Sequence, residues 1–415
     1  MAKRVVLAYS GGLDTSVAVR WMIDNLGVEV IALAVDVGQA AEDYDTLKER
    51  ARAAGAVEAI VVDAKEEYAS GYCAPALAAN ALYENRYPLV SALSRPVIVK
   101  HLVEAARFHG ADAVAHGCTG KGNDQVRFEV STRALNPDLE VIAPVRSWGM
   151  NREESILYAY DHDIPIVATK EKVYSIDDNI WGRAIECGEM EDPWNRPPPG
   201  VWLLTRPTAT EPVEVEIGFD AGVPVSLDGE ALSVLEVVQR LNALVGSYGW
   251  GRIDMVENRR VGIKSRETYE CPGSLALILA HRDLEGICLE RDLQREKTRL
   301  EPRYAELIYD GLWFSPLKQA LDAFVAESQR FVTGDVRLHL SPGSCEVTGR
   351  RSPHSLYDYG LATYDAGDSF RHEDSAGFVR LWGLSVETWA ATQGQLHQGH
   401  PRGHTAQPPR GAAGA

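Results

Sequence analysis

The sequence has few of the features that mark metal-binding, membrane or secreted proteins. Its six cysteines are scattered, and even the closest pair, Cys271 and Cys288, is too widely spaced for a C-x-x-C redox or zinc motif. No uncharged apolar run approaches the ~20 residues that a membrane-spanning helix needs. The apolar stretch near the start, Val5 to Tyr9, is too short for the core of a signal peptide. These absences predict a cytoplasmic protein with reduced thiols.

Basic residues are also scarce. Lys and Arg number 42 against 59 Asp and Glu, which gives a net charge of −17. Because phosphate backbones are held by basic surfaces, this balance argues against a nucleic-acid or anionic-membrane binder. A small basic pocket for an anionic ligand can still lie inside an acidic protein. With 45% hydrophobic residues, the chain has the composition of a globular protein of two or three domains.

The first part of the chain, residues 1–167, alternates short apolar runs with amphipathic segments. This alternation is typical of βαβ units, so we predict a doubly wound α/β domain around a parallel sheet. Pro96 is expected in the first turn of a helix, and Asn151 is a candidate N-cap. The expected strands are 5–9, 28–35, 59–62, 112–115 and 141–143, and the expected helices are 15–26, 45–54, 96–108 and 151–162.

The pattern changes in residues 168–375, which predict a mixed α+β region with antiparallel strands. Apolar and polar residues alternate over 213–219 and again over 336–340, where the turn 341–344 can form a hairpin. Ser233 and Glu236 form a capping box that opens a helix, and Gly246 is a candidate for the position just after its end.

The C-terminal segments have two different compositions. Residues 376–391 are rich in large apolar side chains and predict a helix that packs either on another subunit or on its own chain. Residues 392–415 are rich in Gly, Pro, Gln and His and predict a disordered tail. The tail's three histidines lie among glycines and a proline that break helicity, so we expect no metal site there.

The strongest local signal for a ligand is S-G-G-L-D-T-S at 10–16, between the first expected strand and helix. Glycines there can turn backbone N–H groups inward, and the helix N-terminus adds positive potential, which suits a phosphate or pyrophosphate. A plain strand-to-helix turn capped by Asp14 or Thr15 is the structural alternative. The loop does not match the Walker or the G-x-G-x-x-G pattern.

A second polar loop, at 116–128, follows another expected strand. It combines three glycines with hydroxyl, amide, carboxylate and cationic side chains. Loops at the carboxyl ends of parallel strands are where ligands bind in such folds. A polar surface turn that leads into a capped helix is the alternative, but surface turns seldom combine so many dissimilar groups.

These motifs identify a resemblance. S-G-G-x-D-[ST]-S is similar to the signature of pyrophosphate-loop ATP-binding proteins, which adenylate a substrate and release pyrophosphate. More specifically, the chain resembles the argininosuccinate synthase family from residue 2 to about residue 389, in the segments 8–16, 87–96, 116–129, 256–259, 262–270 and 309–317. The resemblance implies that ATP drives the joining of citrulline to aspartate through a citrullyl adenylate. It also implies Mg²⁺ with the ATP and a homotetramer.

The resemblance further implies a role for each region and for individual residues. It makes 1–167 the nucleotide-binding domain, 168–375 the synthetase and multimerisation domain, and 376–391 an oligomerisation helix. The ATP-binding positions are Ala8, Tyr9, Ser10, Gly11, Gly12, Leu13, Asp14, Thr15, Ser16, Val35 and Gly117. The aspartate-binding positions are Thr119, Asn123 and Asp124. The citrulline-binding positions are Tyr87, Asn123, Arg127, Ser175, Glu257 and Tyr269. Asp124 and Arg127 are the candidate catalytic residues.

The sequence departs from the family's pattern at three positions. Ala92 and Ala184 stand where many members carry a serine, which predicts that citrulline is held by fewer side-chain hydrogen bonds. Cys118 stands where alanine is common, and we interpret it as a packing residue and not as a nucleophile. Two alternative functions are another adenylating pyrophosphate-loop enzyme and a nucleotide sensor without catalysis, since a fold alone does not fix a function.

Overall fold

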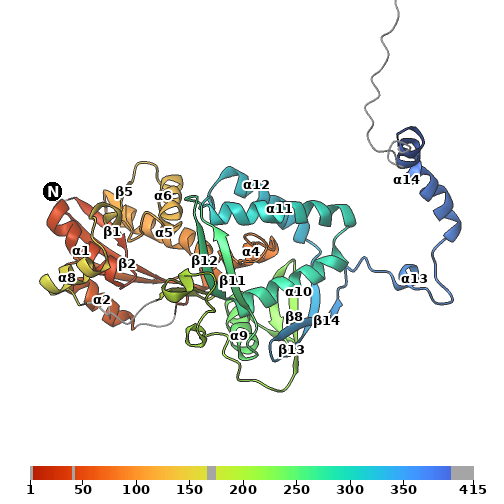
Figure 1. Cartoon of the computed structure of the whole chain (residues 1–415), viewed down its shortest axis with the longest axis horizontal. Helices are drawn as coiled ribbons and strands as arrows, with labels where there is room; N and C mark the ends of the chain where they lie inside the picture. The colour runs from red at the N-terminus through yellow and green to blue at the C-terminus, as the bar shows by residue number, and fades with distance from the viewer. Residues whose placement is uncertain (1–2, 40–42, 166–173, 394–415) are drawn as a thin grey trace, which may run out of the picture. The chain divides into compact units, whose positions relative to one another are not determined.

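The computed structural model describes residues 3–39, 43–165 and 174–393. The chain divides into two compact units, residues 1–356 and 357–415. Figure 1 shows their elements, coloured from red at the N-terminus to blue. The domain boundaries predicted after residues 167 and 375 stay predictions. Within the described ranges, no helix is both long and apolar enough to cross a membrane.

A parallel five-stranded sheet forms the first part of the chain, as predicted. Its strand order is β3-β2-β1-β4-β5, and every neighbouring pair is parallel. Alternate residues of the first strand belong to opposite cores: Val5 and Leu7 face one side, and Val6 faces the other. The strands are β1 (Arg4–Ala8), β2 (Glu29–Asp36), β3 (Glu58–Asp63), β4 (Ala113–Ala115) and β5 (Glu140–Ile142).

Helices cover both faces of this sheet, which makes it doubly wound (Figure 1). The core with Val5 and Leu7 includes α1 (Leu13–Leu26), α2 (Tyr44–Ala53) and α8 (Arg152–Asp161). The core with Val6 includes α5 (Val90–Phe108) and α6 (Asp124–Leu135). Asn151 caps α8 as expected, and Glu154 completes a capping box with it. The shorter helices are α3 (Lys65–Tyr68), η1 (Ala69–Cys73), α4 (Ala74–Ala78) and α7 (Pro144–Ser147).

One predicted helix begins at a different residue. The helix expected from Pro96 begins at Val90, so the proline lies inside it and not in its first turn. The hydroxyl of Tyr87 accepts the N–H of Ser91 at 2.9 Å, which satisfies one of the free donors of the true first turn. The helix can therefore start ahead of the proline and tolerate the loss of the one hydrogen bond that the proline cannot donate.

Two antiparallel sheets and four long helices follow, which confirms the mixed α+β prediction. One sheet has the order β10-β9-β8-β13-β14 and the other β11-β12-β7-β6. The expected hairpin joins β13 to β14. The strands are β6 (Ser175–Asn179), β7 (Gly182–Glu186), β8 (Val213–Asp220), β9 (Val223–Leu227), β10 (Glu230–Ala231), β11 (Arg252–Asn258), β12 (Lys264–Glu270), β13 (Gly334–Ser341) and β14 (Ser344–Arg351). The helices are α9 (Val234–Ser247), α10 (Pro272–Cys288), α11 (Arg291–Tyr309) and α12 (Pro316–Gln329), with 3₁₀ turns η2 (Gly188–Glu191) and η3 (Pro199–Val201).

Helix α9 begins as predicted but ends later. Ser233 and Glu236 form the expected capping box. Gly246, expected just after the helix, lies within its last turn. A Cβ at Gly246 would lie 2.1 Å from the carbonyl oxygen of Leu204, so the glycine is needed for close approach of two backbones and not for a left-handed cap.

The second unit contains α13 (Tyr359–Ala362) and α14 (His372–Thr392). The helix predicted at 376–391 lies within α14, and its large apolar side chains are exposed. Whether it packs on another subunit stays a prediction. The predicted disordered tail lies outside the described residues from 394 onward.

The capping box of α9 predicts a measurable contribution to the stability of the folded protein. The hydroxyl of Ser233 accepts the N–H of Glu236 at 3.3 Å, and the Glu236 carboxylate accepts the N–H of Ser233 at 2.8 Å. We expect Ser233→Ala to lower the free energy of unfolding by about 1 kcal/mol, measured by urea denaturation. Ser70→Ala is the control, because its hydroxyl only donates to the carbonyl of Glu66. Equal stability of both variants would contradict the prediction.

Candidate functional site

A cavity of about 970 Å³ opens at the carboxyl edge of the parallel sheet. Strands β1 and β4 are neighbours there, and the chain leaves them toward opposite sides of the sheet, which is the position where ligands bind in doubly wound folds. The loops after β1 and β4 and strand β6 all contribute to its wall. Its polar and charged lining residues include Ser10, Asp14, Thr15, Tyr44, Arg50, Arg95, Asp124, Arg152, Asp177 and Asp178.

The loop between β1 and α1 is held in the shape that an anion site requires. Gly11 has φ +73°, a conformation that a side chain would strain. The carbonyl of Gly11 accepts a hydrogen bond from Arg50 at 2.9 Å, and the hydroxyls of Ser10 and Thr15 lie 3.2 Å apart. The backbone N–H groups at the start of α1 therefore remain beside the cavity. Ser16 is the exception among the predicted loop residues, because its buried hydroxyl lies against that of Tyr9.

The loops after β1 and β4 touch each other at a glycine. A Cβ on Gly117 would lie 2.8 Å from the Cγ2 atom of Thr15, so a side chain at position 117 would force the Thr15 side chain to shift. Val35, at the end of β2, lines the same cavity on its apolar side. Val35 and Gly117, both predicted to bind the nucleotide, thus lie at the same cavity as the β1–α1 loop.

Asp14 is a carboxylate in an unfavourable environment. Burial raises its pKa, and the positive charge of Arg152 offsets this only in part. Both residues line the cavity from different helices, α1 and α8. A cationic ligand beside Asp14 would relieve the cost of its burial.

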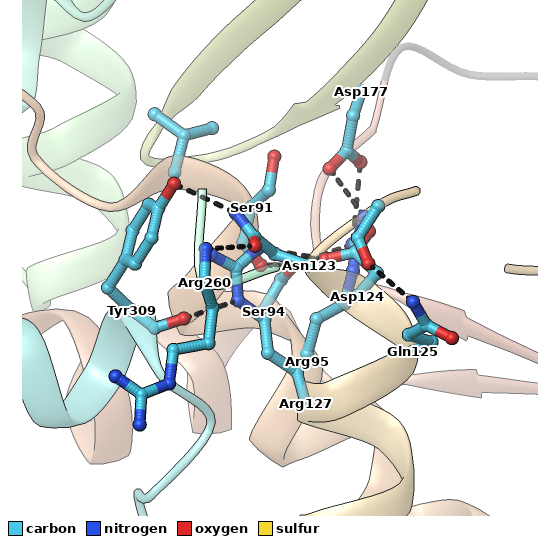
Figure 2. A network of polar contacts seen from close by, with 12 residues as sticks. Ser91, Ser94, Arg95, Asn123, Asp124, Gln125, Arg127, Asp177, Arg260 and Tyr309 are labelled. Atoms are coloured by element: carbon cyan, nitrogen blue, oxygen red, sulfur yellow. Dashed lines mark hydrogen bonds and ion pairs between the residues drawn. The ribbon is translucent and has the colours of Figure 1, made fainter. Parts of the chain in front are cut away.

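An ion-pair network joins this cavity to a second polar region (Figure 2). Arg95, on α5, contacts Asp124 at 2.7 Å and Asp177, on β6, at 2.6 Å. Arg127 contacts the other oxygen of Asp124 at 2.9 Å. Two arginines therefore hold the Asp124 carboxylate, and Arg95 links α5 both to α6 and, through Asp177, to β6.

The two arginines fix the charge of Asp124. Burial raises its pKa, but the charges and hydrogen bonds of Arg95 and Arg127 outweigh burial and hold the pKa well below its usual range. Asp124 therefore stays ionised at neutral pH. An ionised carboxylate of low basicity suits the binding of an ammonium group better than the removal of a proton.

The second polar region is a buried group of tyrosines around Glu257. Its carboxylate, on β11, accepts the hydroxyls of Tyr269 at 3.0 Å and Tyr309 at 2.9 Å. Tyr87 stacks on Tyr269 with ring centroids 4.1 Å apart. Burial raises the pKa of Glu257. The two tyrosine hydrogen bonds lower it, but they offset the effect of burial only in part. Asn123 joins the group by donating to the hydroxyl of Tyr309 at 2.8 Å.

The structure brings most of the predicted site residues together. The loop 8–15, Val35 and Gly117 share one cavity with Asp124, while Tyr87, Asn123, Arg127, Glu257 and Tyr269 form the adjoining buried group. Thr119 and Ser175 are exposed and do not line the cavity. Ala92 is fully buried in α5, and Ala184 pairs with Tyr269 in the sheet register, so their effect on citrulline binding stays a prediction.

Three residues of the network were not among the predicted site positions: Arg95, Asp177 and Tyr309. Arg95 and Tyr309 lie in the motifs 87–96 and 309–317, so the motifs contained the signal but did not assign the residues. Asp177 had no such signal. In the described part of the chain, no group of three or more His, Cys, Asp or Glu side chains could hold a metal ion.

Two family models match the chain. Residues 4–165 match the arginosuccinate synthase N-terminal HUP domain, and residues 174–389 match the arginosuccinate synthase C-terminal domain. The two matches cover both the cavity and the buried tyrosine group.

Two solved structures are remotely similar. One is a predicted subunit of a tRNA methyltransferase from Methanocaldococcus jannaschii, with 14% identity over 38% of this chain and 74% of that chain and a TM-score of 0.26. The other is the U34-tRNA thiolase NcsA from Methanococcus maripaludis with its 4Fe-4S cluster, with 17% identity over 41% of this chain, 62% of that chain and a TM-score of 0.26. Neither likeness bears on function.

The close contact between Gly117 and Thr15 predicts that a methyl group added at position 117 weakens ATP binding. Gly117→Ala would displace the side chain of Thr15, whose hydroxyl we expect to bind phosphate, and we expect ATP affinity to fall about tenfold, measured by calorimetry. Gly120→Ala is the matched control in the same loop, because the nearest atom to its Cβ would be 3.9 Å away. An equal loss in both variants would show that the contact with Thr15 is not the cause.

The raised pKa of Glu257 predicts a pH-dependent stability. Because the folded protein favours the protonated carboxyl, ionisation of Glu257 destabilises the fold increasingly as the pH rises above its ordinary pKa of 4.5. Glu257→Gln removes this titration. We therefore expect the stability of the variant relative to the parent to increase from pH 4.5 upward, measured by urea denaturation at several pH values. A difference that does not change with pH would contradict the shift.

Proposed function

The chain belongs to the argininosuccinate synthase family, and on that premise we propose how its residues divide the reaction between them. Members of this family join citrulline to aspartate at the expense of ATP, and this chain is such a ligase. The citrulline ureido oxygen attacks the α-phosphorus of ATP and pyrophosphate leaves. The aspartate amine then attacks the activated ureido carbon and AMP leaves. Adenylation is needed because the ureido oxygen by itself is a poor leaving group.

We assign ATP to the 970 Å³ cavity. The N–H groups at the start of α1 and the hydroxyls of Ser10 and Thr15 bind the phosphates that become pyrophosphate. They stabilise the negative charge that builds up as this group leaves. Val35 provides an apolar surface for the adenine, and Gly117 leaves room for the nucleotide beside Thr15.

Citrulline occupies the buried tyrosine group in this proposal. Arg127 binds its carboxylate, and Glu257 binds an ammonium or N–H group, so the zwitterion meets a charge of the right sign at each end. Tyr87 and Tyr269, whose rings stack on each other, lie beside it in this proposal. Because Arg127 is also paired with Asp124, the citrulline subsite adjoins the cavity that holds ATP.

Aspartate binds next to Asn123 and Asp124, with Thr119 on the exposed side of the same loop. The low pKa of Asp124 supports a role in holding the aspartate ammonium group until citrulline is activated. Placing all three substrates around one network replaces two encounters in solution with local reactions.

Magnesium accompanies ATP in this proposal. Mg²⁺ usually keeps several waters and is bound by substrate phosphates and one or two carboxylates. Asp14 fits as such a carboxylate, because burial raises its pKa and it faces the phosphate cavity. The ion would neutralise charge on the departing pyrophosphate.

We also propose a homotetramer that works in the cytoplasm. The described part of α14 exposes seven large apolar side chains, more than a solvated helix needs, which supports burial against another subunit. The six cysteines are free thiols, which supports a reducing compartment.

The observation that best supports these roles is the network from Arg95 through Asp124 to Arg127. It connects the phosphate cavity to a second and a third set of substrate-binding groups. A nucleotide sensor does not need such sets, and an unrelated adenylating enzyme does not need charges matched to two amino acids.

The direct test is pyrophosphate release from ATP with each substrate omitted in turn. We expect release to require citrulline, and argininosuccinate to form only when aspartate is also present. Arg127→Gln should abolish citrulline-dependent release because it removes the carboxylate partner, whereas Cys118→Ala should retain it. Release without citrulline, or full activity of Arg127→Gln, would contradict the proposed roles.

A further inference from the structure

We propose that Tyr309 is the positioning residue that holds the citrulline and aspartate subsites in register, acting through Glu257, Asn123 and Arg127. This inference rests on the substrate assignments made above. Tyr309 is the last residue of α11, far in sequence from the loops that bind the substrates, and its side chain is buried.

The hydroxyl of Tyr309 connects Glu257, which we assign to citrulline, with Asn123, which lies between the citrulline and aspartate subsites. It donates to the Glu257 carboxylate at 2.9 Å and accepts from the side-chain amide of Asn123 at 2.8 Å. A hydroxyl has one proton to donate, so donation to Glu257 leaves its lone pairs for the amide. Both bonds can therefore form at once through a single oxygen atom.

These bonds fix which way the Asn123 amide faces. The amide nitrogen of Asn123 donates to Tyr309, and its oxygen accepts the backbone N–H of Arg260 at 2.8 Å. A flipped amide would place donor against donor at Arg260 and lose that bond. The remaining donor of the amide nitrogen then has a defined direction for a substrate.

The backbone of Tyr309 holds Arg127, the third residue through which Tyr309 acts. Its carbonyl accepts a hydrogen bond from Nε of Arg127 at 3.0 Å, and the guanidinium lies 4.9 Å from the centre of the Tyr309 ring. Gly311 allows this contact: its φ is +76°, and a Cβ there would lie 2.8 Å from the Cα of Arg127. The end of α11 is thus in direct contact with the backbone of α6.

Aromatic contacts prevent the ring from turning away. Tyr83 stacks on Tyr309 with centroids 3.6 Å apart and planes 3° from parallel, and Tyr87 contacts it edge-on at 6.5 Å. The hydroxyl of Tyr83 is itself bound to the carbonyl of Asn258 at 2.6 Å. With its ring held on two sides, Tyr309 presents its hydroxyl at a fixed point between Glu257 and Asn123.

The test is Tyr309→Phe in the full-length enzyme. The variant keeps the stacked ring and the carbonyl that Arg127 uses, and it removes only the hydroxyl. Because the hydroxyl serves a group in each subsite, we expect KM to rise roughly tenfold for both citrulline and aspartate, with a smaller change in kcat. The KM for ATP should stay unchanged. Tyr304→Phe is the matched control on the same helix, since its hydroxyl bonds only Asp322 among the described residues.

A pH profile separates positioning from simple packing. Loss of a donor to Glu257 raises its pKa further, so the acid limb of kcat/KM for citrulline should move to higher pH in Tyr309→Phe. The shift should vanish in a Glu257→Gln background. A packing role would lower the melting temperature without moving this limb.

The outcomes distinguish this inference from the proposed function. If the parent enzyme releases pyrophosphate only with citrulline but Tyr309→Phe changes neither KM, or changes only one, the positioning role is overturned. If the parent shows no citrulline-dependent release, the substrate assignments themselves fail. A rise in both KM values together with the shifted acid limb supports the role.

Discussion

The ion pair between Arg95 and Asp124 is the contact on which the organisation of the site depends. Arg95 reaches Asp177 on the other side, and Asp124 reaches Arg127, so four charges lie in one chain across α5, α6 and β6. Taking these charges out of water is costly, and each is stable only because the next one compensates it. The network therefore contributes little to stability as a whole, but it forces three separate segments into one arrangement. In doing so it joins the cavity that we assign to ATP to the groups that we assign to citrulline and aspartate.

The tyrosine group around Glu257 is a second, less charged network that also joins separate segments of the chain. Among the described residues Glu257 forms no ion pair and accepts hydrogen bonds from two phenol hydroxyls, so burial raises its pKa whereas the pKa of Asp124 is lowered. Two carboxylates in neighbouring positions thus have different charge behaviour for an identifiable reason. This difference fits the proposed assignment of the two carboxylates to different substrates, with Asp124 beside the ammonium group of aspartate and Glu257 beside an N–H group of citrulline.

Local sequence rules predicted those elements that depend on neighbours in the chain. The N-cap at Asn151 and the capping box at Ser233 are as expected, because helix caps are made by residues within three positions of one another. The same rules were wrong at Pro96 and Gly246. In the first case the hydroxyl of Tyr87 supports an earlier helix start, and in the second the backbone at Leu204 explains the glycine. Each error reflects a contact that the local pattern does not contain.

The sequence by itself determined the parallel sheet and the family, since these follow from hydrophobic periodicity and from contiguous motifs, and it predicted a phosphate-binding loop after the first strand. It also placed Asn123, Asp124 and Arg127 in one polar loop, although Asp124 and Arg127 belong to helix α6, which was not among the expected helices. Only the tertiary structure decided the charge of Asp124 and the role of Tyr309. The charge depends on Arg95, 29 positions away, and the role on contacts between Tyr309 and Asn123, 186 positions apart. Electrostatic and hydrogen-bond partners act over a few ångströms in space, so their effects can be assigned only after the chain has folded.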